Sequence, residues 1–113
     1  MIKMLVAKQN GELILGKVSK EDSDLIDLED VVQINIIQTQ QGISPLPGYY
    51  PSYILKDFIR QTVLNSLSHE FVKKDYIIFN EEDVKDEVIT IYRKEMAQRS
   101  GIVLTTTMPN LNG

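Results

Sequence analysis

Residues 4–18 read MLVAKQNGELILGKV, and this stretch carries the strongest structural signal in the chain. Asn10-Gly11 is typical of a tight turn between antiparallel strands, because both residues tolerate a positive φ. We therefore expect a hairpin with strands at Met4–Lys8 and Glu12–Val18. Gly16 lies inside the second strand, where glycine usually marks a bulge or a sharp bend. Small barrels need such bends so that one strand can serve both halves of the sheet.

A longer strand is expected at Leu25–Ile37, after the polar turn Ser19–Asp24. Its apolar residues mostly recur every second position, which places them on one face of a strand. These residues are Ile26, Leu28, Val32, Ile34 and Ile36. Asp30 interrupts the apolar series, so we expect a bend or bulge there.

The segment from 39 to 66 is predicted to be a long inserted loop. Its first part, Thr39–Tyr50, is rich in glutamine, glycine and proline, which are frequent in loops. The second part, Tyr53–Leu64, combines helical spacing of apolar residues with β-branched content. A helix and a strand both remain open for it, and we favour the helix.

Two short strands, Leu67–Val72 and Tyr76–Phe79, are expected on either side of the polar turn Lys73–Asp75. A helix over residues 80–100 should follow, with Asn80 as its N-cap and Gly101 ending it. Its apolar positions follow helical spacing: Val84, Val88, Ile91, Tyr92 and Met96. The tail at 102–113 is predicted to be partly mobile.

Length and composition predict a single soluble domain spanning residues 1–113. The chain has 12 basic and 16 acidic side chains, so its net charge is −4. Strong non-specific nucleic-acid binding needs a basic field, which this composition does not supply. No cysteine is present, which excludes disulfides and thiolate metal sites. With no long apolar run, we expect no membrane contact and a cytoplasmic location.

The order of these elements resembles the first sequence motif of the Sm-like family. The resemblance rests on the Asn10-Gly11 turn, on Gly16 and Val18, and on the strand Leu25–Asp30. Phe71–Phe79 is similar to the second motif, in which two apolar strands flank a basic turn. The resemblance implies a mainly β fold: a strongly bent, five-stranded antiparallel barrel. Here that barrel would have an enlarged loop between strands 3 and 4 and a C-terminal helix. The chain is also similar to small proteins of tailed phages, which would place it in the host cytoplasm.

The resemblance also implies a homo-oligomer, because Sm-like subunits form closed rings through their last two strands. We expect about five to seven subunits. Unpaired strand edges are a liability that pairing between subunits would remove. The residues expected at this interface are Leu67, Phe71, Val72, Tyr76, Ile77 and Phe79.

Sm-like proteins bind single-stranded RNA at two turns, and the matching turns here carry Asp22, Ser23 and Asp24 and then Lys73 and Lys74. The chain departs from the family at both places. No asparagine follows the acidic residues of the first turn, and lysines replace the Arg-Gly pair in the second. Two hypotheses therefore stay open: a ring that binds single-stranded RNA weakly, and a ring that serves as a protein-interaction hub without nucleic acid.

An enzyme is the least favoured reading of the sequence. His69 is the only histidine, so one subunit cannot form a histidine-pair metal site. Neither a nucleophile elbow nor a phosphate-binding glycine loop is present. We expect no catalytic residue, no metal ion and no cofactor, and we expect His69 to lie partly exposed on a strand face.

Overall fold

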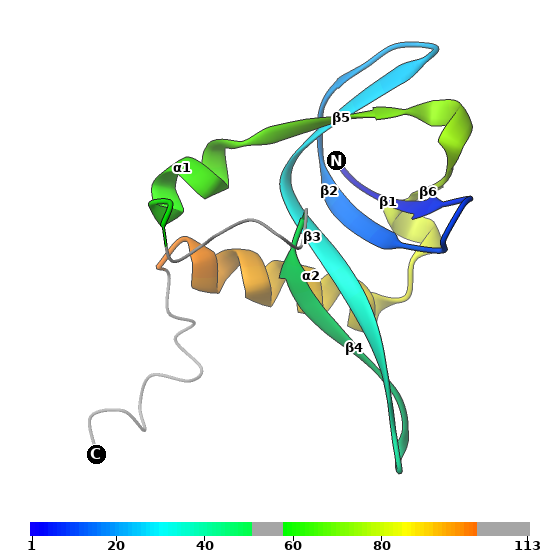
Figure 1. Ribbon diagram of the computed structural model, residues 1–113, viewed down its shortest axis with the longest axis vertical. Coiled ribbons are helices and arrows are strands. Elements are labelled where there is room, and N and C mark those ends of the chain that lie inside the picture. The colour runs from blue at the N-terminus through cyan, green and yellow to red at the C-terminus, as the bar shows by residue number, and fades with distance from the viewer. Residues whose placement is uncertain (51–57, 102–113) are drawn as a thin grey trace.

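The computed structural model describes residues 1–50 and 58–101, which form one open antiparallel sheet and two helices (Figure 1). The strands are β1 (Ile2–Ala7), β2 (Leu13–Glu21), β3 (Leu25–Thr39), β4 (Gly42–Tyr49), β5 (Ser68–Val72) and β6 (Tyr76–Asn80). The helices are α1 (Gln61–Ser66) and α2 (Asp86–Arg99), and single 3₁₀ turns occupy Lys73–Asp75 and Glu81–Asp83. The strand order is β4-β3-β2-β1-β6, and β5 also pairs with β3.

The predicted N-terminal hairpin is confirmed, with β1 and β2 joined through a turn in which Gly11 has a φ of 73°. The pairing of β2 with β3 shifts register between Leu15 and Lys17, so Gly16 lies at an irregularity, as expected. A Cβ atom at Gly16 would lie 2.9 Å from the Cβ of Leu28 and 3.2 Å from the carbonyl oxygen of Glu29. Glycine is needed there because the β2 backbone passes against β3 too closely for a side chain.

The expected bend in the third strand is also confirmed. Asp30 has a φ of 53°, a left-handed conformation that non-glycine residues rarely adopt. Before the bend, Leu25–Glu29 pairs with β5, and after it Val32–Thr39 pairs with β4. Because β2 occupies the opposite edge of β3 on both sides of the bend, β4 and β5 share one edge of that strand.

The prediction of a loop at Thr39–Tyr50 is wrong, because most of this segment is strand β4. It forms a hairpin with β3, which raises the strand number to six from the expected five. Pro45 and Pro47 are two residues apart, so both lack an N–H on the same side of β4. An edge strand tolerates this when that side faces away from its partner. In the second part of the predicted loop, α1 is helical only from Gln61, and residues 51–57 lie outside the described residues.

The C-terminal helix begins later than predicted. Asn80 precedes the 3₁₀ turn Glu81–Asp83 and forms a capping box with Asp83, whose carboxylate accepts the Asn80 N–H at 3.3 Å. Helix α2 itself begins at Asp86. The predicted tail at 102–113 lies outside the described residues.

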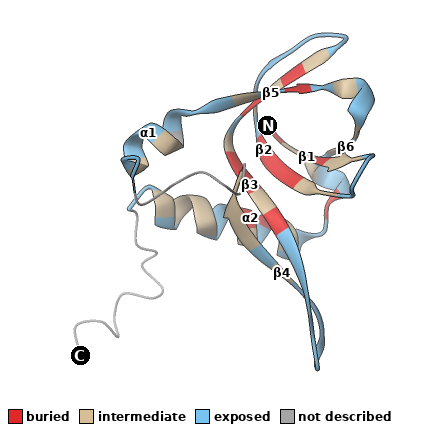
Figure 2. Ribbon diagram, in the orientation of Figure 1, coloured by how far each residue is buried: buried red, intermediate tan, exposed pale blue. Residues whose placement is uncertain are grey.

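Buried side chains form two clusters, and the neighbouring residues Ile14 and Leu15, which face opposite sides of β2, belong to different ones. Figure 2 shows buried positions along β2 and β3. The cluster under α2 contains Ile2, Leu15, Val32, Ile34, Val84, Ile89 and Tyr92. The other contains Leu5, Ile14, Ile26, Leu28, Val31 and Phe71. The helical spacing correctly assigned Tyr92 to the core, whereas Ile89 was missed and its neighbour Val88 is only partly buried. One apolar face of the sheet therefore packs against α2, and the other is enclosed by the bending of β2 and β3.

The outer half of the β3–β4 hairpin, which we call the arm (residues 35–46), extends away from the rest of the sheet (Figure 1). Most of it is exposed (Figure 2), including the side chains of Ile36, Ile37, Ile43 and Leu46. No charged side chain occurs between residues 31 and 55. The arm is thus an uncharged surface with exposed aliphatic groups in an otherwise charge-rich chain.

We expect Gly16→Val to lower the free energy of unfolding by on the order of 1–3 kcal/mol, because its side chain must displace Leu28 or the β3 backbone. Denaturant unfolding followed by circular dichroism measures this change. Lys20→Val is the matched control, since Lys20 is exposed in the same strand, and it should stay within about 0.5 kcal/mol of wild type. Equal stability of the two variants would contradict the close approach at Gly16.

Candidate nucleic-acid interface

The two turns that the sequence singled out lie together in the structure. Pairing of β5 with the first half of β3 places Val72 opposite Leu25, and the Lys73 N–H donates to the carbonyl oxygen of Asp24 at 2.9 Å. Four of the five predicted RNA-binding residues then border one surface cavity of about 430 Å³. The cavity is lined by Ser23, Asp24, Val72, Lys73 and Lys74.

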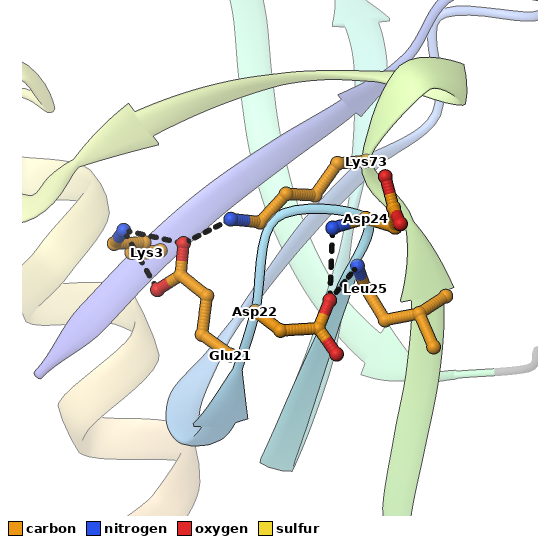
Figure 3. A network of polar contacts seen from close by, with 6 residues as sticks. All are labelled: Lys3, Glu21, Asp22, Asp24, Leu25 and Lys73. Atoms are coloured by element: carbon orange, nitrogen blue, oxygen red, sulfur yellow. Dashed lines mark hydrogen bonds and ion pairs between the residues drawn. The ribbon is translucent and has the colours of Figure 1, made fainter.

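Asp22, the fifth predicted residue, does not line this cavity and instead holds the turn together (Figure 3). Its Oδ1 accepts the backbone N–H groups of Asp24 and Leu25, each at 2.8 Å. These two hydrogen bonds lower the pKa of the Asp22 carboxyl below its usual value of 3.8. The side chain therefore performs the local role that aspartate commonly has in turns.

Lys73 is engaged in an ion pair that the sequence did not predict. Its Nζ lies 2.7 Å from Oε2 of Glu21, whose Oε1 accepts from Lys3 at 3.2 Å (Figure 3). The hydrogen bond from Lys73 is the main cause that lowers the pKa of the Glu21 carboxyl below 4.5, and Lys3 adds to it. Three strands meet in this cluster, because Lys3 belongs to β1, Glu21 ends β2 and Lys73 follows β5.

The remaining polar groups of the cavity are available to a ligand. Among the described residues, neither Lys74 Nζ nor the side-chain oxygens of Ser23 and Asp24 make a hydrogen bond or ion pair. Lys74 also borders a second cavity of about 470 Å³, together with Lys8 and Asn10 from the β1–β2 turn. The first cavity is thus lined by one cation without an ion pair, one hydroxyl and one carboxylate, a set that suits a ligand with both hydrogen-bonding edges and anionic groups.

The residues predicted at a subunit interface divide into two groups. Phe71 is only 3% exposed and packs in the core, so it is not on the surface where a neighbour could reach it. Its side chain points inward because alternate residues of β5 face opposite sides. Tyr76 and Phe79 are partly buried against the two clusters. By contrast Leu67, Val72 and Ile77 are 36%, 39% and 48% exposed. Val72 and Ile77 lie in β5 and β6, and Leu67 directly precedes β5.

His69 is partly buried on β5, as predicted, and its ring meets the ring of Tyr50 edge-on with centroids 5.4 Å apart. Burial lowers the pKa of the imidazole below 6.5, which favours its neutral form. Within residues 1–50 and 58–101, no group of three or more histidine or acidic side chains has the arrangement to hold a metal ion. No helix in those ranges combines the length and apolar character needed to cross a bilayer.

No protein-family model matches the sequence, and no curated protein matches it.

Because the two lowered pKa values have different causes, they should respond differently to one substitution. Lys73→Gln should raise the pKa of Glu21 toward 4.5, since its main hydrogen bond is lost, and should move that of Asp22 much less. Carbon-detected NMR titration of the side-chain carboxyls between about pH 2 and 7 resolves both groups. Lys8→Gln is the control of equal charge change, and it should leave both values unchanged. Equal upward shifts of Glu21 and Asp22 in Lys73→Gln would refute this assignment.

Proposed function

We propose that the chain is an Sm-like subunit of a closed homo-oligomeric ring and that the ring binds single-stranded RNA weakly at the cavity between the β2–β3 and β5–β6 turns. The observation that carries this proposal is the hydrogen bond from Lys73 N–H to Asp24, which joins the two turns. These are the turns at which the sequence resemblance implied RNA binding. The path β6-β1-β2-β3-β5 supports the proposal because it has β5 and β6 at its ends, and these are the two strands that the resemblance implies pair between subunits.

Ring closure is supported by the edges of the sheet. Within the described residues, β5 pairs only with β3 and β6 pairs only with β1, so each has one unpaired edge. Neither strand contains proline, whereas Pro45 and Pro47 each remove an N–H donor from β4. Pairing of β5 in one subunit with β6 in the next is a head-to-tail contact, which must close into a ring or grow into a filament. A ring of about five to seven subunits satisfies both edges.

RNA binding at the cavity would combine two kinds of contact. Ser23 and Asp24 offer an acceptor and donor set for a base or ribose edge, and Lys74 offers a cation for phosphate. One subunit supplies little positive charge, because the chain carries −4 overall. A ring would repeat each cavity and concentrate its lysines, so the proposed binding depends on assembly and falls with salt.

A second candidate function is a protein-interaction hub with the same ring but without RNA. The observation that favours it is the uncharged arm, where Ile43 is 71% exposed. Exposed apolar surface of this kind is typical of protein contacts. The acidic net charge and the engagement of Lys73 by Glu21 point in the same direction.

The ring is tested by mass in solution. We expect multi-angle light scattering to give about five to seven times the 12.9 kDa of one chain over a tenfold range of concentration. Val72→Lys combined with Ile77→Lys should release folded monomers, because charge at the two edges opposes pairing between subunits. Ile43→Lys is the matched control on the arm and should leave the mass unchanged. A wild-type monomer at all concentrations would refute the ring.

RNA binding is tested with fluorescent oligouridylate and oligoadenylate at about 50 mM salt. Lys74→Gln should weaken binding at least severalfold without changing the ring, and affinity should fall steeply between about 50 and 200 mM salt, since phosphate contacts release counterions. Lys94→Gln, an exposed lysine of α2, is the control with the same charge change. An intact ring with no detectable binding would reject the RNA function and leave the hub. Binding that does not depend on salt would contradict the proposed phosphate contact.

A further inference from the structure

Beside the cavity, the carboxylate of Glu21 accepts hydrogen bonds from two lysines of the same chain. Glu21 receives Lys73 at 2.7 Å on one carboxylate oxygen and Lys3 at 3.2 Å on the other (Figure 3). The side chains of Lys3 and Lys73 are 14% and 24% exposed, so water screens this cluster less than it screens a fully exposed pair. Both oxygens of Glu21 are therefore in use, and one of them engages the ammonium of Lys73, a residue that lines the cavity.

A phosphate group that approached Lys73 would meet the carboxylate of Glu21. The two are oxyanions with similar hydrogen-bonding demands, and placing both beside one ammonium brings like charges within a few ångströms. Lys73 can serve the phosphate only by weakening its contact with Glu21. Lys3 remains next to Glu21 in either case, because it comes from β1 and does not line the cavity.

We infer that Glu21 is an internal competitor for the RNA phosphate, which occupies Lys73 in the free protein and sets the affinity of the cavity below what its lysines could provide. This inference rests on the proposed RNA function and adds a residue that limits it. The free cavity then presents Lys74 as its only unengaged cation among the described residues that line it. Displacement of Glu21 makes Lys73 available as a second cation.

The turn geometry explains why Glu21 stays in this position. Asp22 fixes the next residues of the turn through its two backbone hydrogen bonds, and Glu21 ends β2 immediately before them. Its backbone is paired with Ile26 of β3, so the carboxylate is presented at a fixed place toward Lys3 and Lys73. A competitor held in this way acts in every subunit of a ring at once.

The test compares Glu21→Gln with Glu87→Gln, an exposed acid in the first turn of α2 that gives the same change in net charge. Oligouridylate is titrated against both at about 50 mM salt, with ring mass and melting temperature measured alongside. Glu21→Gln should bind roughly three- to tenfold more tightly than Glu87→Gln, on the order expected for releasing a partly screened ion pair. Its affinity should also fall more steeply with salt, because one more phosphate contact forms per site.

A double substitution identifies the lysine involved. In Glu21→Gln combined with Lys73→Gln, the gain over Lys73→Gln alone should disappear, because Lys3, the other lysine that Glu21 holds, does not line the cavity. A gain that persists without Lys73, or a Glu21→Gln affinity within twofold of Glu87→Gln while wild type binds, would overturn the inference and leave the RNA function standing. Binding by Glu21→Gln when wild type does not bind would support the inference. An intact ring in which neither wild type nor Glu21→Gln binds would reject the RNA function, and the inference with it.

Discussion

The left-handed backbone at Asp30 is the constraint on which the rest of the structure depends, because it lets one strand serve two partners along the same edge. The chain stabilises this conformation from two sides. Tyr92, 1% exposed in α2, donates its hydroxyl hydrogen to the carbonyl oxygen of Asp30 at 2.7 Å. Lys17 of β2 lies 3.5 Å from the Asp30 carboxylate. Burial raises the pKa of Tyr92, so its hydroxyl keeps the proton that this bond needs. Helix α2 is thus both a cover for the core and the support of the bend.

The bend also determines where the candidate interface forms. Before Asp30, β3 receives β5, and this pairing brings Lys73 to Asp24. After Asp30, β3 leaves β5 and pairs with β4 to form the arm. Arg99 at the end of α2 fixes this second half, because it donates to the carbonyl oxygens of Val31 and Gly48 at 3.1 and 2.9 Å. The cavity and the arm therefore both result from the change at Asp30, where the partner of β3 changes from β5 to β4.

What the sequence predicted correctly is local. The Asn10-Gly11 turn and the irregularity at Gly16 depend on the backbone preferences of one or two residues, and the bend at Asp30 coincides with a break in the local alternation of apolar residues. Strand β4 was missed because its prolines are typical of a loop. Proline only removes an N–H donor, and the sequence does not show whether that side of the strand has a partner. The contact of Glu21 with Lys73 was missed for a related reason. It arises from the pairing of β3 with β5 and follows no periodicity within either segment.

The distribution of charge along the chain bears on whether nucleic acid can bind at the cavity. Residues 31–55 carry no charge, so the 28 charged side chains of the chain lie in the rest of it, and acids outnumber bases by four. In such a chain, a lysine at the surface readily forms an ion pair with a carboxylate of the same chain. Lys73 is an example, because it pairs with Glu21. If each site has to give up an ion pair to bind nucleic acid, as we infer, binding would need several sites that act together on one strand. The proposed ring would supply that gain by repeating the same site in every subunit. The arm differs from the cavity in this respect, because its uncharged surface offers no ion pair that a bound apolar surface would have to break.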